Sequence, residues 1–83
     1  GWTIQVGAFE KQSNAQSKAK SVATQGQGVN LGPARIVPSI DVNGRKLYLV
    51  QIGQFSTFVT AKTARNRLRA SQGSIIVPLA RGL

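Results

Sequence analysis

A six-residue pattern that occurs twice limits how this chain can fold. Ile4–Phe9 (IQVGAF) returns as Val50–Phe55 (VQIGQF), and each copy is followed by an alanine-bearing segment and a Gln-Gly pair. At the same offset Ala15 corresponds to Ala61, and Val22 corresponds to Leu68. Each half is therefore predicted to be a strand, a Gly-x-Phe corner and a helix that stops near glycine. Neither half can bury its apolar face alone, so we expect the two to pack together around an approximate two-fold axis.

The spacing of apolar residues predicts the type of each element. Trp2 to Phe9 alternates with period two, which is typical of a half-buried strand. Its two faces are predicted to carry Trp2, Ile4, Val6 and Ala8 toward the core and Thr3, Gln5 and Gly7 away from it. Two helices follow from apolar positions three or four apart. The first carries Ala15, Ala19, Val22 and Ala23, is capped by Ser13 or Asn14 and stops at Gly26; the second carries Ala61, Ala64 and Leu68, is capped by Thr57 or Thr60 and ends near Gln72-Gly73.

Three further strands complete the predicted sheet. Ala34 to Ile40 contains Pro38, which places it at an edge or on a bulge because proline donates no ladder hydrogen bond. Asn43-Gly44 predicts a hairpin, since both residue types tolerate positive φ. The remaining strands are expected at Lys46–Gly53 and Ser74–Pro78. The order βαββαβ predicts an α+β fold of the ferredoxin/RNP-like type, with a four-stranded antiparallel sheet, both helices on one face, and the first and third strands central.

The amino-acid composition excludes several classes of function but does not select one. We expect residues 1–83 to form one domain, excised from a longer protein. The chain has no cysteine and no histidine, and its only carboxylates, Glu10 and Asp41, lie beside turns among cations. We therefore predict no enzyme activity, no metal and no cofactor. No apolar run is long enough to span a membrane. The net charge of +9 attracts polyanions, whether nucleic acid, an anionic membrane or a cell-envelope polymer.

The face of the sheet away from the helices is the predicted binding surface. Its strands are expected to present Thr3 and Gln5, then Leu47, Leu49 and Gln51, and from the fourth strand either Ile75 and Val77 or Ile76. Apolar groups flanked by carboxamides suit a sugar chain, because Gln5 offers both donors and an acceptor. Arg35, Arg45 and Lys46 cluster nearby and are candidate electrostatic contacts. The alternative is that Leu47 and Leu49 are ordinary exposed leucines or are covered by the tail from Leu79.

Three stretches of the sequence match a known family: WTIQVGAF (residues 2–9), LYLVQIGQF (residues 47–55) and the helix ending RLRASQG (residues 67–73). They resemble the SPOR (sporulation-related repeat) family, and the resemblance covers essentially the whole chain. The resemblance implies a βαββαβ module of bacterial envelope proteins that binds peptidoglycan glycan strands stripped of stem peptides and collects at the division septum. It also implies a site on the open sheet face, where the family's first-strand glutamine corresponds to Gln5. A small residue that the family has shortly after this glutamine, often serine, corresponds to Ala8. The family's apolar contact on the fourth strand falls near Val77. Positions that carry Trp and Arg in the family correspond to Leu47 and Leu49 here.

These observations predict a non-catalytic glycan-binding module. We expect its glycan contacts to be Gln5, Ala8, Leu47, Leu49, Gln51 and Val77. We expect the domain to be monomeric, to occupy the bacterial periplasm or cell envelope, and to bring a larger protein to the cell wall or septum. Two alternatives remain. An RNA-binding module would share the βαββαβ order, but the predicted open face lacks the aromatic residues on which such domains stack bases. A protein–protein adaptor would use the apolar part of the same face.

Overall fold

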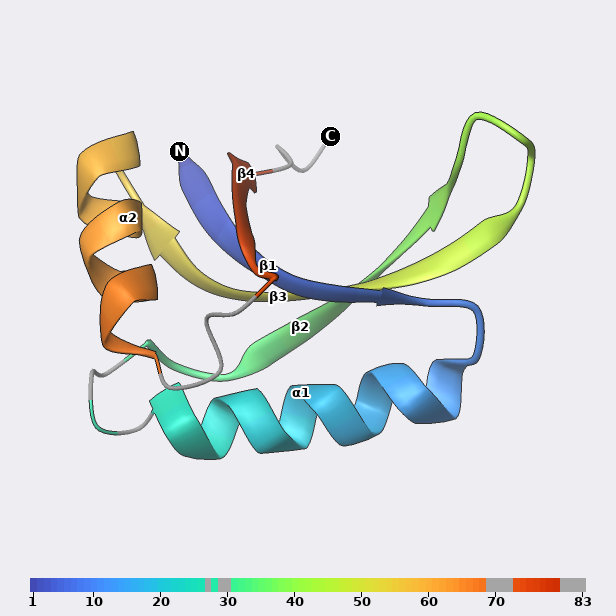
Figure 1. The fold of residues 1–83 in the computed structure, drawn as a ribbon, viewed down its shortest axis with the longest axis horizontal. Helices are drawn as coiled ribbons and strands as arrows, with labels where there is room; N and C mark the ends of the chain where they lie inside the picture. Colours follow the sequence, from blue (N-terminus) through green and yellow to red (C-terminus); the bar gives the residue numbers. More distant parts are fainter. Residues whose placement is uncertain (27, 29–30, 69–72, 80–83) are drawn as a thin grey trace.

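The computed structural model describes residues 1–26, 28, 31–68 and 73–79, and its elements follow the predicted order (Figure 1). The elements are β1 (Trp2–Phe9), α1 (Gln12–Gly26), β2 (Ala34–Ile40), β3 (Lys46–Phe55), α2 (Phe58–Arg67) and β4 (Ile75–Pro78). The four strands form one antiparallel sheet in the order β2-β3-β1-β4, which confirms that the first and third strands are central. β2, which contains Pro38, is an edge strand as predicted.

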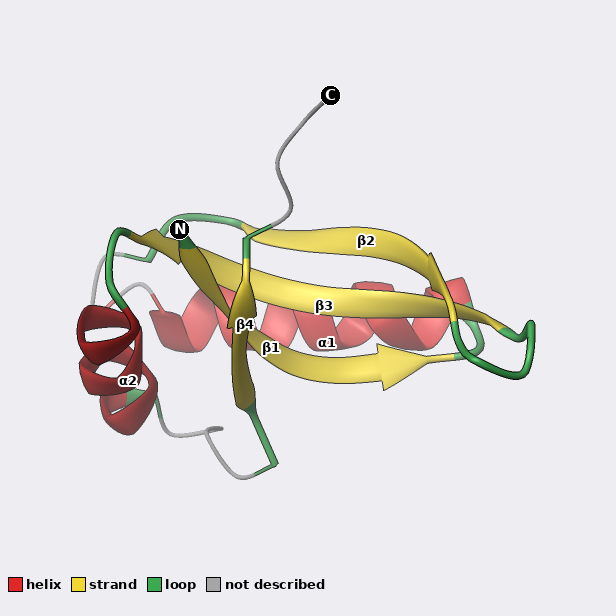
Figure 2. Ribbon diagram, turned by 90° about the horizontal axis from the view of Figure 1, so that it is seen from above, coloured by secondary structure: helices red, strands yellow, loops and turns green. Residues whose placement is uncertain are grey.

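Both helices contribute to a single core on one side of this sheet. α1 runs along the sheet and contacts β1, β2 and β3, whereas α2 stands at one end and contacts β1, β3 and β4 (Figures 1 and 2). Trp2, on the helix side of β1, packs edge-on against Phe58 of α2 with ring centroids 5.3 Å apart. The fold therefore matches the predicted α+β architecture.

The residues related by the sequence repeat are the residues that fill the core. The fully buried side chains include Ile4 and Val50, Ala15 and Ala61, and Val22, while Leu68 is 3% exposed. One apolar cluster, against which Phe9 and Phe55 pack, fills the core. It consists of Ile4, Val6, Val50, Ile52, Ala15, Val22 and Leu68. The two halves thus bury equivalent positions against each other, as the repeat predicts.

The Gly-x-Phe corner has the same physical basis in both halves. A Cβ on Gly7 would stand 2.7 Å from the ring of Phe9, and one on Gly53 would stand 2.5 Å from the ring of Phe55. Each phenyl ring therefore folds back over the glycine two residues before it, a placement that no larger residue permits. Gly53 also has a φ of +86°, which is unfavourable for residues with a Cβ.

Register shifts accompany both glycines and change which side chains face outward. Along β1 and β3 the pairing runs from Gln5↔Gln51 to Gly7↔Val50 and then Ala8↔Leu49. The bulge inserts one residue into β1, so the alternation reverses after it. Ala8 is exposed opposite Leu49, whereas strict alternation had predicted that it faces the core. A second shift, between Trp2 and Ile4, lies opposite Gly53.

Element boundaries differ from the predictions in a few places. β3 continues through its bulge to Phe55, past the expected end at Gly53, and α1 begins at Gln12, ahead of the expected caps Ser13 and Asn14. α1 includes Gly26 as its last residue, as predicted. α2 ends at Arg67 with Leu68 as its C-cap, short of the predicted end; Gln72 lies outside the described residues. Thr57 caps α2 by accepting a hydrogen bond from the Thr60 amide at 3.1 Å.

The hairpin between β2 and β3 forms at the predicted Asn43-Gly44 turn. Gly44 has a φ of +80° and its amide donates to the Asp41 carbonyl at 3.0 Å. The Asp41 side chain accepts from the amides of Asn43 and Arg45, both at 2.9 Å. Ile40 consequently pairs with Lys46, which sets the register of β2 on β3 as far as the Ala34↔Ile52 pair.

Candidate functional site

The sheet face opposite α1 carries the residues predicted to bind a ligand. Figure 2 looks onto this face, with α1 behind the strands, and no described helix lies over it. Cross-strand partners share a face, so the pairings Arg35↔Gln51↔Gln5↔Ile75 and Val37↔Leu49↔Ala8 define its rows. Thr3 pairs with Val77 and Ser39 with Leu47. Of the two alternatives for the fourth strand, Ile75 and Val77 are therefore the outward pair, while Ile76 lies opposite Ile4 on the core side.

Two glutamines of the sequence repeat meet at the centre of this face. The side-chain amide of Gln51 donates to the Gln5 side-chain oxygen at 3.3 Å. Gln51 is only 7% exposed, whereas Gln5 is half-buried. Among the described residues nothing pairs with the amide nitrogen of Gln5, so that donor is available to a ligand. The pair thus offers a fixed, partly exposed carboxamide edge.

An arginine is held over the same face by the bulge in β3. Arg35 Nη2 donates to Thr3 Oγ1 at 2.7 Å and to the Gly53 carbonyl at 3.2 Å. The Thr3 hydroxyl, fully buried beneath it, lies 2.7 Å from the Gly53 carbonyl and 3.1 Å from that of Ile52, so its proton is directed to these acceptors. In a regular strand pair the Gly53 carbonyl would accept a hydrogen bond from the neighbouring strand. The bulge leaves it to accept from Arg35 and Thr3.

Apolar side chains extend the face beyond the polar centre. Leu47, Leu49 and Val37 are half-buried, Ala8 is exposed, and Ile75 is 51% exposed. Apolar groups of this kind can pack on the flat face of a sugar ring while the neighbouring amides bind its polar edge. The predicted glycan contacts Gln5, Ala8, Leu47, Leu49, Gln51 and Val77 thus lie together on one surface.

The three predicted electrostatic contacts separate in space. Arg35 lies on the open face, but Arg45 lies in the hairpin, where its Nη1 is 2.6 Å from Glu10 Oε1 in an exposed ion pair. Lys46 belongs to the helix-side register, opposite Ile40, and its ammonium group stands 5.4 Å from the centre of the Tyr48 ring. Among these three cations, only Arg35 is integrated into the candidate site.

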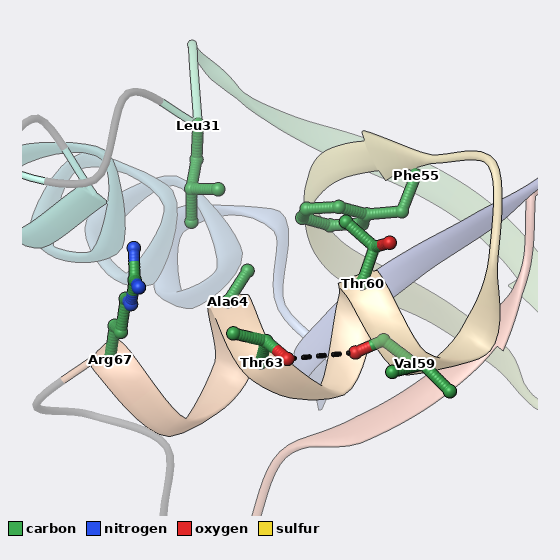
Figure 3. Close-up of a pocket in the computed structure, with 7 residues that line it drawn as sticks. All are labelled: Leu31, Phe55, Val59, Thr60, Thr63, Ala64 and Arg67. Carbon is green, nitrogen blue, oxygen red and sulfur yellow. Dashed lines mark hydrogen bonds between the residues drawn. The ribbon is translucent and has the colours of Figure 1, made fainter.

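Two hollows lie near the end of the sheet that carries Gly53. One, of about 380 Å³, separates α2 from the segment before β2 and is lined by Leu31, Phe55, Val59, Thr60, Thr63, Ala64 and Arg67 (Figure 3). The Thr63 hydroxyl there donates to the Val59 carbonyl at 3.0 Å, and the Thr60 hydroxyl lies 2.7 Å from that of Thr57. This hollow contains none of the predicted site residues. The other, of about 330 Å³, is lined by Leu31, Pro33, Arg35 and Gln54 and therefore adjoins the candidate site.

In residues 1–26, 28, 31–68 and 73–79, no three side chains of the metal-binding types gather into a cluster. None of the helices in the described part of the chain is long and apolar enough to cross a membrane.

Sequence reasoning left out three residues of this surface. Val37 and Ser39 were assigned no face, although the Asn43-Gly44 hairpin sets their register opposite Leu49 and Leu47. Gln54 follows the bulge at Gly53, which removes it from regular alternation, and the glycine is the only sequence signal for that bulge. The contact between Arg35 and Thr3 depends on that same bulge.

Comparison with known proteins identifies relatives at the level of family and fold. The SPOR domain family model matches residues 1–78. The crystal structure of the RlpA SPOR domain from Pseudomonas aeruginosa superimposes with a TM-score of 0.70 at 21% sequence identity, covering 95% of this chain and 100% of that one. No curated protein matches the sequence.

Proposed function

The chain belongs to the SPOR domain family, and from that premise we propose that it is a non-catalytic module that binds peptidoglycan through its open sheet face. The ligand is a glycan strand stripped of its stem peptides. Binding brings a larger protein, of which this monomeric domain is one part, to the cell wall in the bacterial periplasm, including the division septum.

The observation that carries this proposal is the combination of groups on one accessible face. The Gln5–Gln51 pair presents a carboxamide beside the half-buried Leu47 and Leu49. A saccharide has apolar ring faces and edges of hydroxyl and acetamido groups, so it can meet both kinds of contact at once. The net charge of +9 adds attraction, because removing a stem peptide leaves a carboxylate on muramic acid.

RNA binding fits this face poorly. Domains of the same strand order stack bases on aromatic side chains of the first and third strands. The outward positions here are Thr3, Gln5 and Ala8 on β1 and Leu47, Leu49 and Gln51 on β3, none of which is aromatic.

The proposal is tested by sedimentation with amidase-treated peptidoglycan. Gln5→Glu places a carboxylate against a polyanion, and Leu49→Glu removes an apolar contact, so each variant should lose binding by at least about tenfold, the effect of 1.4 kcal/mol. Gln16→Glu on the exposed side of α1 makes the same chemical change as Gln5→Glu on the opposite side of the domain and should bind almost as wild type does.

Circular dichroism would verify that each variant folds. Val59→Glu, at a position 72% exposed on α2, is the matched control for Leu49→Glu. Undiminished binding by both sheet-face variants would show that the site lies elsewhere. A wild-type domain that captures single-stranded RNA but not glycan would overturn the proposed function itself.

A further inference from the structure

We propose that Arg35 reads the free lactyl carboxylate of a muramic acid whose stem peptide has been removed. This inference rests on the proposed function and deepens it, because it assigns the preference for stripped strands to one positioned guanidinium. Arg35 was predicted from sequence only as one of several electrostatic contacts. The structure distinguishes it from the others by how it is held.

The guanidinium is anchored through one of its nitrogens. Nη2 donates to Thr3 Oγ1 at 2.7 Å and to the Gly53 carbonyl at 3.2 Å, and Thr3 is itself fully buried. Anchoring reduces the rotamer entropy that a long side chain loses when it binds a ligand. Thr3 and the bulge carbonyl of Gly53 therefore act as positioning groups.

The rest of the guanidinium is available. Within the described part of the chain, Nη1 and Nε of Arg35 have no hydrogen-bond acceptor and Arg35 has no acidic partner. The only two acids are committed elsewhere, since Glu10 pairs with Arg45 and the Asp41 side chain accepts from backbone amides of the hairpin. Nη1 and Nε lie on different edges of the guanidinium, so each can donate its own charge-assisted hydrogen bond to a carboxylate oxygen.

A hollow beside Arg35 has the volume and lining for the group that carries this carboxylate. It measures about 330 Å³ and is lined by Arg35, Gln54, Leu31 and Pro33. A lactyl group has a methyl branch, which suits the walls formed by Leu31 and Pro33. Its carboxylate would meet Arg35, and Gln54 offers an amide donor at the same hollow.

The same arrangement disfavours a strand that retains its peptides. An intact stem peptide converts the lactyl carboxylate into an amide, which removes the negative charge and adds bulk. The guanidinium then donates to a neutral amide oxygen in place of a carboxylate oxygen, and the attraction between opposite charges is lost. The loss of charge at this position should therefore weaken binding by roughly tenfold.

The experiment compares two preparations of one glycan. Amidase-treated strands are divided, and one half is coupled with methylamine so that every lactyl carboxylate becomes a methylamide. Wild type should bind the unmodified strands roughly tenfold more tightly than the methylamide strands. Arg35→Gln should bind both preparations equally and weakly. Lys20→Gln, which removes one positive charge from the exposed surface of α1, should keep the wild-type preference.

Two further variants cover the case in which Arg35→Gln fails to fold. Arg35→Lys keeps the charge but loses the planar guanidinium that is anchored at one nitrogen while the others stay free, and Thr3→Val removes the anchoring hydroxyl without changing side-chain volume much, so each should show a reduced preference. Equal binding of both preparations by wild type would overturn the role of the carboxylate and leave glycan binding intact. An unchanged preference in Arg35→Gln, or in Arg35→Lys and Thr3→Val together, would overturn the role of Arg35. Binding of neither preparation by wild type would overturn the proposed function.

Discussion

Gly53 satisfies two separate requirements at one residue, and substitutions can separate them. Its φ of +86° is unfavourable for any residue with a Cβ, and that Cβ would stand 2.5 Å from the Phe55 ring. Backbone strain and overpacking each cost about 1–3 kcal/mol. We therefore expect Gly53→Ala to lower the free energy of unfolding by about 2–4 kcal/mol, measured by urea denaturation.

The chain contains a matched control for each requirement. Gly44 has a φ of +80° but open space where a Cβ would stand, so Gly44→Ala reports the backbone term alone at about 1 kcal/mol. A Cβ on Gly7 would meet the Phe9 ring at 2.7 Å, so Gly7→Ala reports the steric term. If Gly53→Ala costs no more than Gly44→Ala, the ring does not require the glycine.

Residue-level prediction from sequence succeeded where burial decides and failed where the bulges decide. The repeat identified Val22 and Leu68 as equivalent, and both are buried. Period-two counting placed Ala8 inside, because alternation carries no information about an inserted residue; the structure exposes Ala8 opposite Leu49. The repeated glycine was the available signal, but it shows only that a bulge is permitted.

At the scale of the element, α2 is a short helix whose start depends on one hydroxyl. The Thr57 side chain accepts from the Thr60 amide at 3.1 Å, and only Ala61 within the helix is fully buried. Thr57→Ala leaves an amide at the helix start without this acceptor. We expect it to cost about 1 kcal/mol of unfolding free energy, measured by thermal or urea denaturation.

The control for this prediction is Thr63, six residues after Thr57 and within the same helix. Thr63 is exposed and donates its hydroxyl to the Val59 carbonyl at 3.0 Å, a contact that does not satisfy a free amide. Because alanine also has the higher helix propensity, Thr63→Ala should be neutral or slightly stabilising. A Thr57→Ala variant as stable as Thr63→Ala would show that the cap contributes nothing measurable.

Elements were predictable to the extent that their signals are local. The Asn43-Gly44 turn and the alternating strands sufficed for β1, β2 and the hairpin. The end of α2 was placed too late because Gln72-Gly73 resembled the glycine stop of α1, whereas the helix ends at Arg67. The Arg35–Thr3 contact joins β2 to β1 across β3, so it follows from sheet order and the Gly53 bulge together and from no single segment.

At the scale of the whole molecule, the charges are distributed so unevenly that salt should act in two opposite directions. Both acidic side chains lie near the hairpin, where Glu10 pairs with Arg45 and Asp41 closes the turn, so in the described part of the chain the cations elsewhere have no acidic side chain as a partner. A net charge of +9 destabilises the compact state through self-repulsion and also attracts polyanions. Screening weakens both effects, because the Debye length falls from ~30 Å at 0.01 M to ~3 Å at 1 M.

Raising the salt concentration should therefore stabilise the domain while weakening its binding to glycan. We expect the free energy of unfolding to increase with sodium chloride, measured by urea denaturation at each concentration. Sedimentation with amidase-treated glycan should decrease over the same range. The opposite signs are informative, because a loss of binding cannot then be attributed to unfolding.

Methylamide-coupled strands serve as the control: they have lost their lactyl carboxylates, so their residual binding through Leu49 and the glutamine pair should change little with salt. If binding to both preparations is equally insensitive to salt, the positive charge plays no part in recognition.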